Sequence, residues 1–335
     1  MELEFSFIIP VYNRPEEIKE LLQSFCALKT TTPFEIVIVE DGSNISSKEV
    51  VEYFNNGLNI SYYFKENSGP GDSRNFGMKK AKGNYFIILD SDCILPENYL
   101  SEIEKSLNNT YVDCFGGPDA AHESFSNLQK AINFSMTSVI TTGGIRGNKN
   151  SVDRFQPRSF NMGLSKEAFN ASNGFGRIHP GEDPDLSIRL WHLGYKTKLI
   201  PTAFVYHKRR ISWRKFYKQV NKFGLVRPIL NAWHPKTIKL TYWFPTVFVL
   251  GLLLAVLLWI FNFKWLLMVY ILYFLVVFLL ALVSTKNLIV AILALVAIVV
   301  QFFGYGYGFL KSTLAINIFK KKAESYFPHL FFNKV

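Results

Sequence analysis

The chain has 335 residues, of which 49% are hydrophobic, and a formal net charge of +11. This length allows one large or two medium domains. The three cysteines, Cys26, Cys93 and Cys114, are odd in number and lack metal-ligand spacing, which argues against a disulfide framework or a zinc cluster. The acidic start Met1-Glu2-Leu3-Glu4 leads straight into an apolar run, so we expect no secretory signal.

The first hundred residues alternate between strand and helix patterns. We expect strands at 3–11, 35–39, 60–64 and 85–89, and helices at 16–28, 48–54 and about 71–82. Such alternation predicts an α/β domain with a mostly parallel sheet covered by helices on both faces. Ligands of such sheets bind outside the carboxyl ends of the strands.

Polar clusters follow three of these strands: Tyr12-Asn13-Arg14, Glu40-Asp41-Gly42-Ser43 and Asp90-Ser91-Asp92. Residues two apart in extended chain share a face, so Asp90 and Asp92 can point together off the strand end. The pair is either an ordinary Asx-type turn or a site for a hard divalent cation such as Mg²⁺. Three clusters at one sheet edge favour a functional site.

No G-x-G-x-x-G follows the first strand, and no G-x-x-x-x-G-K-[ST] occurs. Both absences argue against a dinucleotide oxidoreductase and a P-loop ATPase. The segment 67–75, with Arg74 one turn into the next helix, is either a capped turn or a site for a diphosphate.

Regular patterns weaken from residue 116 to 160. Gly116-Gly117-Pro118 breaks the chain, residues 127–139 have a helical pattern, and 141–150 form a Gly- and Asn-rich segment. Long irregular stretches in compact domains often cover substrates, and we expect that role here.

Three carboxylates open a further predicted helix at Gly181-Glu182-Asp183-Pro184-Asp185. Acids are favoured in a first helical turn, but Glu182 and Asp183 precede Pro184 and are expected outside the helix proper, where one could act as a general base. A strand at 197–206 then ends at His207, which is either structural or a metal ligand.

Together these motifs resemble those of the family 2 glycosyltransferases, enzymes of GT-A fold that use nucleotide-sugar donors. The resemblance covers residues 3–210 and rests on five segments in the family's order: 8–14, 39–43, 67–75, 90–92 and 181–185.

The resemblance implies a donor site of Pro10, Tyr12 and Arg14 around the base and ribose, with Asp41 reading the base edge and Arg74 on the base or phosphates. Glu40 stands where Asp is usual. The other donor-binding positions that it implies are Ser43, Asn67, Gly71, Asp90 and Ser91.

It also implies that Asp92 binds the Mg²⁺ or Mn²⁺ that bridges the diphosphate, with Asp90 and His207 as further metal-site residues. Asp183 corresponds to the base that deprotonates the acceptor hydroxyl, with Glu182 as the second choice. Contacts to the acceptor or sugar are expected from Gly117, Asn161, Gly163 and Glu182. One base without a second nucleophilic carboxylate favours direct displacement with inversion.

The last third of the chain predicts a membrane region. Apolar runs at 242–261, 265–283 and 288–310 approach or exceed the length that spans a bilayer, and a buried soluble core is the weaker interpretation. Between His207 and Leu240 lie ten Lys or Arg residues and no acid. We therefore expect residues 212–227 to form a helix on an anionic membrane surface and not to bind nucleic acid.

The expected organisation is a GT-A domain at 1–210, a basic interfacial segment at 211–240, a transmembrane α-helical region at 241–310 and a basic tail at 311–335. The basic flank favours a cytoplasmic catalytic domain. The family resemblance implies a bacterial inner membrane. Three spans place Lys320-Lys321-Lys322 on the other side, so we also consider that the Gly-rich stretch 304–308 breaks or re-enters.

The expected reaction transfers a sugar from a UDP- or GDP-type donor to a polyprenyl-diphosphate-linked saccharide, as in the succinoglycan-type branch that this layout resembles. A polyprenyl-phosphate monosaccharide synthase is the alternative enzyme, and a sugar-nucleotide- or lipid-binding scaffold is the non-enzymatic alternative.

Overall fold

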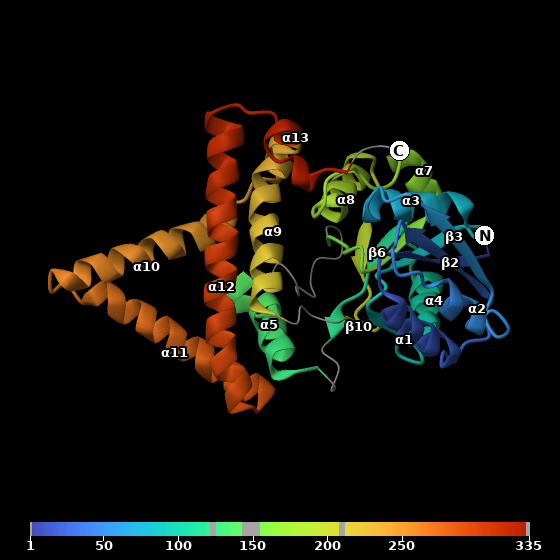
Figure 1. Ribbon diagram of the computed structural model, residues 1–335, viewed down its shortest axis with the longest axis horizontal. Helices are drawn as coiled ribbons and strands as arrows, with labels where there is room; N and C mark the ends of the chain where they lie inside the picture. The colour runs from blue at the N-terminus through green and yellow to red at the C-terminus, as the bar shows by residue number, and fades with distance from the viewer. Residues whose placement is uncertain (1, 121–124, 143–154, 208–211, 333–335) are drawn as a thin grey trace. The chain divides into compact units, whose positions relative to one another are not determined.

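The computed structural model describes residues 2–120, 125–142, 155–207 and 212–332, and the chain forms two compact units (Figure 1). The sheet unit comprises the described residues of 1–122, 149–207 and 331–335, and the helical unit comprises those of 123–148 and 208–330.

The sheet unit is built on seven strands in the order β3-β2-β1-β4-β8-β6-β9. These strands are β1 (Phe5–Val11), β2 (Phe34–Asp41), β3 (Ile60–Lys65), β4 (Tyr85–Leu89), β6 (Cys114–Gly116), β8 (Asn161–Ser165) and β9 (Thr197–Leu199). The first four are parallel, and β8 is antiparallel to β4 and β6. The expected mostly parallel sheet is confirmed.

Helices cover both faces of this sheet, because its central strands are apolar on both sides. Phe7 and Ile9 of β1 pack toward one face with α1 (Pro15–Cys26), α2 (Lys48–Phe54) and α4 (Tyr99–Asn109). Ile8 of β1 packs toward the other face with α3 (Pro70–Lys80), α7 (Lys166–Ser172) and α8 (Glu182–His192). The carboxyl edge of the strands is left for the polar clusters.

A second, three-stranded sheet has the order β5-β10-β7. It consists of β5 (Cys93–Ile94), β7 (Asp119–Ala120) and β10 (Val205–His207). The strand expected at 197–206 is therefore two short strands, β9 and β10, which lie in different sheets. This division brings His207 opposite Cys93 in an antiparallel pair.

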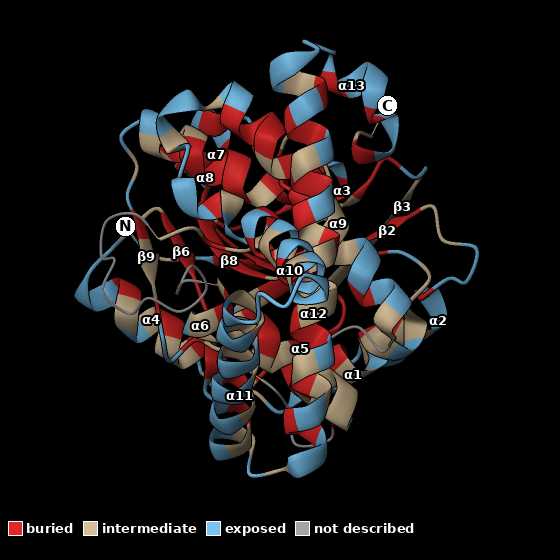
Figure 2. Ribbon diagram, turned by 90° about the vertical axis from the view of Figure 1, so that its left-hand side faces the viewer, coloured by how far each residue is buried: buried red, intermediate tan, exposed pale blue. Residues whose placement is uncertain are grey.

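The helical unit contains α5 (Asn127–Thr137), α6 (Val139–Thr142), α9 (Trp213–Trp233), α10 (Phe244–Ile260), α11 (Trp265–Thr285), α12 (Leu288–Thr313) and α13 (Ala323–Tyr326). Its described residues include three helical stretches long and apolar enough to cross a membrane, at Leu240–Ile260, Trp265–Thr285 and Leu288–Ile318. Large apolar side chains such as Leu257, Leu272 and Val283 are exposed on them, as the pale blue of α10 and α11 in Figure 2 shows.

Helix α12 is continuous through the Gly-rich stretch, so the break or re-entry considered from the sequence does not occur. The glycines instead permit close packing of α12 beside α9 (Figure 1). A Cβ atom built on Gly308 would lie 2.5 Å from the carbonyl oxygen of Asn221, and one on Gly224 would clash with the carbonyl of Tyr305. This is small-residue packing of the kind found between membrane helices.

Three further boundaries differ from expectation. Helix α8 begins at Glu182, so Glu182 and Asp183 lie inside its first turn and not before it. Helix α9 runs past Arg227 to Trp233, with Pro228 inside it. Of the predicted covering segment 141–150, Thr141 and Thr142 belong to α6, and 143–150 lie outside the described residues.

Candidate active site

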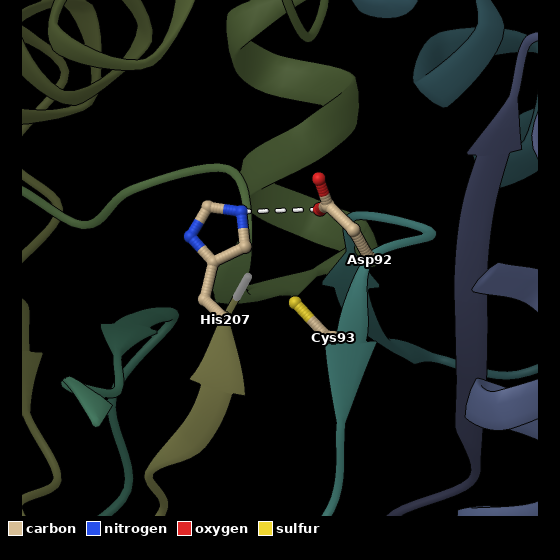
Figure 3. A group of neighbouring side chains, drawn as sticks. All are labelled: Asp92, Cys93 and His207. Atoms are coloured by element: carbon tan, nitrogen blue, oxygen red, sulfur yellow. Dashed lines mark hydrogen bonds and ion pairs between the residues drawn. The ribbon is translucent and has the colours of Figure 1, made fainter. Parts of the chain in front are cut away.

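Two carboxylates and a histidine meet beyond the carboxyl end of β4. Asp90 and Asp92 follow this strand in a tight turn, and the pairing of β5 with β10 brings His207 to them. The His207 Nε2 atom lies 3.1 Å from Asp92 Oδ1 (Figure 3). It also lies 4.0 Å from Asp90 Oδ2. The imidazole stacks on the Phe160 ring at a centroid distance of 4.7 Å, which fixes its plane.

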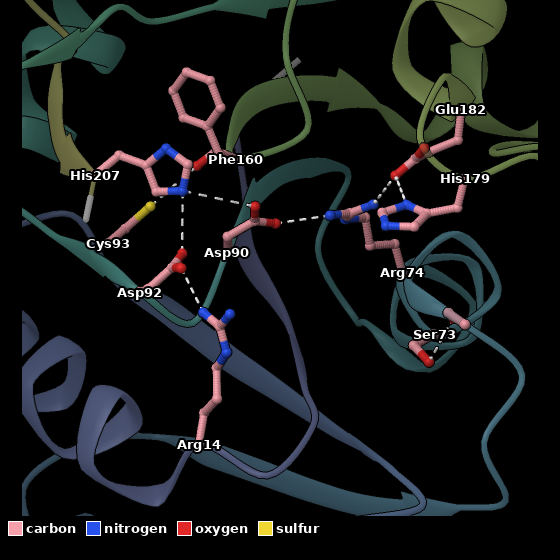
Figure 4. Close-up of polar contacts among 11 residues, drawn as sticks. Arg14, Ser73, Arg74, Asp90, Asp92, Cys93, Phe160, His179, Glu182 and His207 are labelled. Atoms are coloured by element: carbon pink, nitrogen blue, oxygen red, sulfur yellow. Dashed lines mark hydrogen bonds and ion pairs between the residues drawn. The ribbon is translucent and has the colours of Figure 1, made fainter. Parts of the chain in front are cut away.

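Two arginines flank these carboxylates. Arg14 forms an ion pair with Asp92, and Arg74 Nη2 lies 2.7 Å from Asp90 Oδ1 (Figure 4). Burial alone would raise the pKa of Asp92, but the opposing charges of His207 and Arg14 lower this pKa well below its usual range. The site is therefore anionic at its centre and cationic at both sides.

The residues at this point suit a divalent cation. The nearest side-chain ligand atoms of Asp92, Cys93 and His207 all lie within 4.8 Å of one another. Carboxylate oxygens with one imidazole nitrogen suit Mg²⁺ or Mn²⁺. Burial raises the pKa of the Cys93 thiol, and this thiol donates to the Phe160 carbonyl at 3.4 Å. Mg²⁺ and Mn²⁺ prefer oxygen and imidazole ligands to sulfur, and this thiol is engaged with a carbonyl group, so Asp90, Asp92 and His207 are the better candidate ligands.

The neighbouring acids Glu182 and Asp183 differ sharply in their surroundings. Glu182 Oε1 lies 2.9 Å from His179 Nδ1 and 3.1 Å from Arg74 Nη1. Although burial raises the pKa of Glu182, His179 and Arg74 lower it to about 2. Glu182 is thus held as a buried carboxylate by two partners.

Among the described residues, the Asp183 carboxylate has one weak partner, because Arg158 Nη1 is 3.5 Å from its Oδ2 atom. Burial raises the pKa of Asp183, and Arg158 offsets only part of that effect. Adjacent acids whose pKa values are driven apart are typical of divided catalytic roles. Of the two, Asp183 is the one whose pKa is raised, which makes it the better candidate for a proton acceptor.

Residues of the second motif hold the turn before α3. The Asp41 carboxylate accepts from Lys65 Nζ at 2.6 Å and from the backbone N–H groups of Ser68 and Gly69 at 3.0 Å each. Asn67 donates to the Asp41 carbonyl at 2.8 Å. These bonds define the backbone of 67–71, so a base-reading role for Asp41 remains a prediction.

Glu40 is fully buried, and its carboxylate accepts hydrogen bonds from nearby residues of the sheet unit. It accepts from the Ser47 N–H at 2.8 Å and the Tyr62 hydroxyl at 3.1 Å, and Ser43 also donates to it. Glu40 and Ser43 therefore shape the loop after β2. Tyr12, by contrast, is half exposed at the strand edge.

The remaining predicted positions lie as follows. Pro10 is in β1, Ser91 is buried between the two aspartates, and Gly71 is in the first turn of α3. Gly163 is in β8, under the Phe115 ring.

Asn161 is fully buried and binds the Tyr99 hydroxyl at 2.6 Å and the Ala203 carbonyl at 2.8 Å, and Gly117 packs against it. The structure gives Gly117, Asn161 and Gly163 packing roles, and their contact with sugar or acceptor stays a prediction.

Four residues near the site carry no motif that the sequence analysis used: Lys65, Arg158, His179 and Phe332. His179 had a usable signal, because it lies three residues before Glu182. Phe332 had none: its ring packs directly on Gly69, its N–H donates to the Arg177 carbonyl at 3.1 Å, and it is 6.0 Å from the His179 ring.

Both the sequence and the fold of this chain are similar to those of known glycosyltransferases. Residues 6–170 match the sequence model of glycosyl transferase family 2. An uncharacterized glycosyltransferase of Rickettsia bellii (strain RML369-C) is 35% identical over 99 residues, which cover 30% of this chain and 14% of that protein. Poly(ribitol-phosphate) β-N-acetylglucosaminyltransferase TarS of Staphylococcus aureus (strain Mu50) is 32% identical over 114 residues, which cover 33% of this chain and 20% of TarS.

Among solved structures, the mannosyltransferase PcManGT of Pyrobaculum calidifontis, in complex with GDP-Man and Mn²⁺, superimposes with a TM-score of 0.52 at 16% identity. The superposition covers 67% of this chain and 63% of that one. At this identity the similarity concerns the fold.

Proposed function

Residues 6–170 form a family 2 glycosyltransferase domain within a sheet unit of GT-A fold, and from this we propose that the chain transfers a sugar from a nucleotide-diphosphate sugar to a hydroxyl group. The finer proposal is an inverting transfer, assisted by Mg²⁺ or Mn²⁺, to a polyprenyl-diphosphate-linked saccharide in cell-surface or exopolysaccharide synthesis.

The observation that supports this proposal best is the position of Arg74. One guanidinium group contacts Asp90 beside the candidate metal site and Glu182 at the start of α8. Asp183 is the next residue along α8. Arg74 therefore couples the strand edge that would hold the donor diphosphate to the helix turn that carries the candidate base.

Asp92, Asp90 and His207 would hold the cation, which when bound neutralises the charge that develops on the leaving diphosphate. Arg14 and Arg74 add positive charge on either side of this position. Asp183 would accept the proton of the acceptor hydroxyl as this oxygen attacks the anomeric carbon. The bond to the diphosphate breaks as the new glycosidic bond forms.

Inversion is proposed because a single displacement needs one base and no nucleophilic carboxylate. Asp183 supplies the base. Glu182, its neighbour, is engaged by His179 and Arg74 and is not free to attack a sugar.

The membrane part of the proposal is supported by the helical unit. The apolar helices α10, α11 and α12 would anchor the enzyme, and α9 supplies cations without nearby acids. We propose a bacterial inner membrane with catalysis on its cytoplasmic side, where nucleotide-sugars and polyprenyl-linked acceptors are both available. No nucleic acid is involved in this proposal.

The alternative acceptor is a polyprenyl phosphate itself. A phosphate is already anionic and needs no base, whereas the burial-raised pKa of Asp183 favours an acceptor with a proton to lose. This supports the hydroxyl acceptor.

The test is a screen of UDP- and GDP-sugars with the purified full-length protein. Each donor is offered with a polyprenyl-diphosphate-linked saccharide, with polyprenyl phosphate or with no acceptor, and released nucleotide is measured. We expect release that depends on the saccharide acceptor and on a divalent cation. Release with polyprenyl phosphate alone would favour the alternative, and no acceptor-dependent release with any donor would refute the proposed function.

A further inference from the structure

Arg227 is a cation of the helical unit that has no acidic partner among the described residues. It lies in α9, and its guanidinium carbon is 4.4 Å from the centre of the Tyr242 ring. Its Nη1 atom is buried and has no hydrogen-bond partner among the described residues. None of the ion pairs of the described residues involves Arg227, and the sequence has no acid between Asp185 and Glu324.

A buried guanidinium N–H without an acceptor is costly. Stacking on Tyr242 compensates part of the cost but supplies no acceptor for Nη1. Ionisable groups packed against membrane helices usually have a functional partner for this reason. Tyr305, the other neighbour of this guanidinium group, is a phenol and not an acid. Among the described residues Arg227 therefore has no anionic partner, and a bound anion would supply the acceptor that Nη1 lacks.

Other unpartnered polar groups lie at a similar level of the same two helices. Helices α9 and α12 run in the same direction, since Gly304 contacts Val220 while Gly308 contacts Asn221 and Leu225. About one turn beyond this contact come Arg227 on α9 and Ser312 and Thr313 on α12. The Ser312 and Thr313 hydroxyls are buried and have no hydrogen-bond partner in the described structure.

A second group of cations gathers on α9, α12 and the following segment. Partial burial of His329, and then the charges of Lys222 and Lys311, lower the pKa of its imidazole. Like charges this close also favour a bound anion.

We propose that Arg227 is the centre of a binding site for the phosphate group of a lipid. The guanidinium fork matches phosphate oxygens, and hydroxyl groups can donate to the same oxygens. Tyr242 lies at the start of the first apolar stretch, where amphipathic aromatic side chains mark the level of lipid headgroups. A soluble phosphate compound would not explain this position.

Two lipids carry this chemistry. One is the diphosphate of the polyprenyl-linked acceptor, a source that rests on the proposed function, and the other is an anionic phospholipid of the membrane. Binding in the absence of any sugar donor separates this proposal from the proposed function, because no transfer is needed for the measurement.

The experiment uses the full-length protein in neutral-detergent micelles. It is titrated with polyprenyl diphosphate in one arm and with phosphatidylglycerol in the other, and bound lipid is counted by native mass spectrometry. Arg227→Gln is expected to weaken binding about tenfold or more in at least one arm, because charge-assisted hydrogen bonds to phosphate are lost. Lys218→Gln, an exposed cation of the same helix, is the matched control and should change binding by less than about twofold.

Arg227→Lys should bind with intermediate affinity, because it keeps the charge and loses the fork. If Arg227→Gln does not fold, Arg227→Lys replaces it in the same binding measurement. Loss in the polyprenyl diphosphate arm alone assigns the site to the acceptor, and loss in the phosphatidylglycerol arm alone assigns it to membrane lipid. The proposal is overturned if Arg227→Gln binds both lipids like the wild type, if Lys218→Gln loses as much as Arg227→Gln, or if the wild type binds neither lipid.

Discussion

Arg74 Nη1 lies 3.1 Å from Glu182 Oε1, and both side chains are almost completely buried. The two residues are 108 positions apart in the sequence, one on α3 and one on α8. A buried ion pair contributes little net stability compared with apolar packing, but removing one partner leaves a charge without compensation. The pair therefore fixes the position of the α8 N-terminus relative to the strand edge at Asp90.

Replacing Arg74 by methionine should destabilise the protein strongly. Glu182 and Asp90 would both lose their arginine partner, so the free energy of unfolding of the sheet unit should fall by about 3–5 kcal/mol. Lys48→Met, which breaks the exposed pair of Lys48 with Glu52, should cost at most about 0.5 kcal/mol. Chemical denaturation monitored by far-UV circular dichroism measures both, and equal effects would contradict the structural role of Arg74.

Glu182 should make stability depend on acid pH. Its pKa is about 2 in the folded protein and near 4.5 when unperturbed, so the unfolded state binds the proton more tightly. The stabilisation from Glu182 is then fully present above about pH 4.5 and is lost as the pH falls toward 2. The wild type should lose more stability between pH 6 and pH 3 than Glu182→Gln does, and parallel losses in denaturant titrations at the two pH values would refute this.

Asp183→Asn should abolish transfer and leave substrate binding intact. Loss of a general base typically lowers kcat about 10²- to 10⁴-fold, while nucleotide affinity should change by less than about threefold. Because burial raises the pKa of Asp183, wild-type kcat/KM should fall on the acid side with a midpoint above that of an ordinary aspartate.

The matched control is Asp185→Asn on the same helix. Asp185 pairs with Arg189 at 2.9 Å and has no proposed chemical role. The Asp185→Asn variant should retain most of the wild-type transfer rate. Wild-type transfer by Asp183→Asn would exclude Asp183 as the base.

Much of the fold and site was predictable, for local reasons. The runs 48–54 and 85–89 have the expected bounds because their apolar spacing and flanking residues agree with their tertiary positions. The contact between Asp92 and His207 was harder to predict from the sequence, because His207 reaches Asp92 only through the β5–β10 pairing of the second sheet. The grouping of the described residues 125–142 with the helical unit, and of 331–332 with the sheet unit, depends on long-range packing that local sequence patterns do not predict.

The helix start at Glu182 shows the same limit. A proline in the first turn is compatible with a helix that begins before it, so the position of Pro184 did not define the boundary. What the pattern could not reveal is that Arg74 and His179 hold Glu182 and leave Asp183 less engaged. That difference separates the two acids chemically.

Asp92→Asn should remove most of the affinity for Mn²⁺, and Cys93→Ser should not. Asp92 offers a carboxylate next to His207, whereas the Cys93 thiol is a soft ligand and donates to the Phe160 carbonyl. By calorimetry we expect the dissociation constant for Mn²⁺ to be at least about tenfold larger for Asp92→Asn than for the wild type. For Cys93→Ser it should change by less than about twofold. Adding EDTA should stop transfer by the wild type, and Mn²⁺ should restore it. An equal loss in both variants would indicate that the thiol is a ligand.

Gly308→Val should separate α12 from α9. The carbonyl oxygen of Asn221 and the backbone nitrogen of Leu225 would lie 2.5 Å and 3.0 Å from the new Cβ atom, and backbone atoms in two packed helices cannot move aside as a side chain can. Because the contact tolerates no added methyl group, we expect a loss of at least about 2 kcal/mol in the helical unit. Gly57→Ala is the control, since a Cβ atom there meets nothing within 4 Å. Thermal unfolding in detergent should show a lower midpoint for Gly308→Val alone, and an unchanged midpoint would mean that the two helices pack less tightly than their glycines indicate.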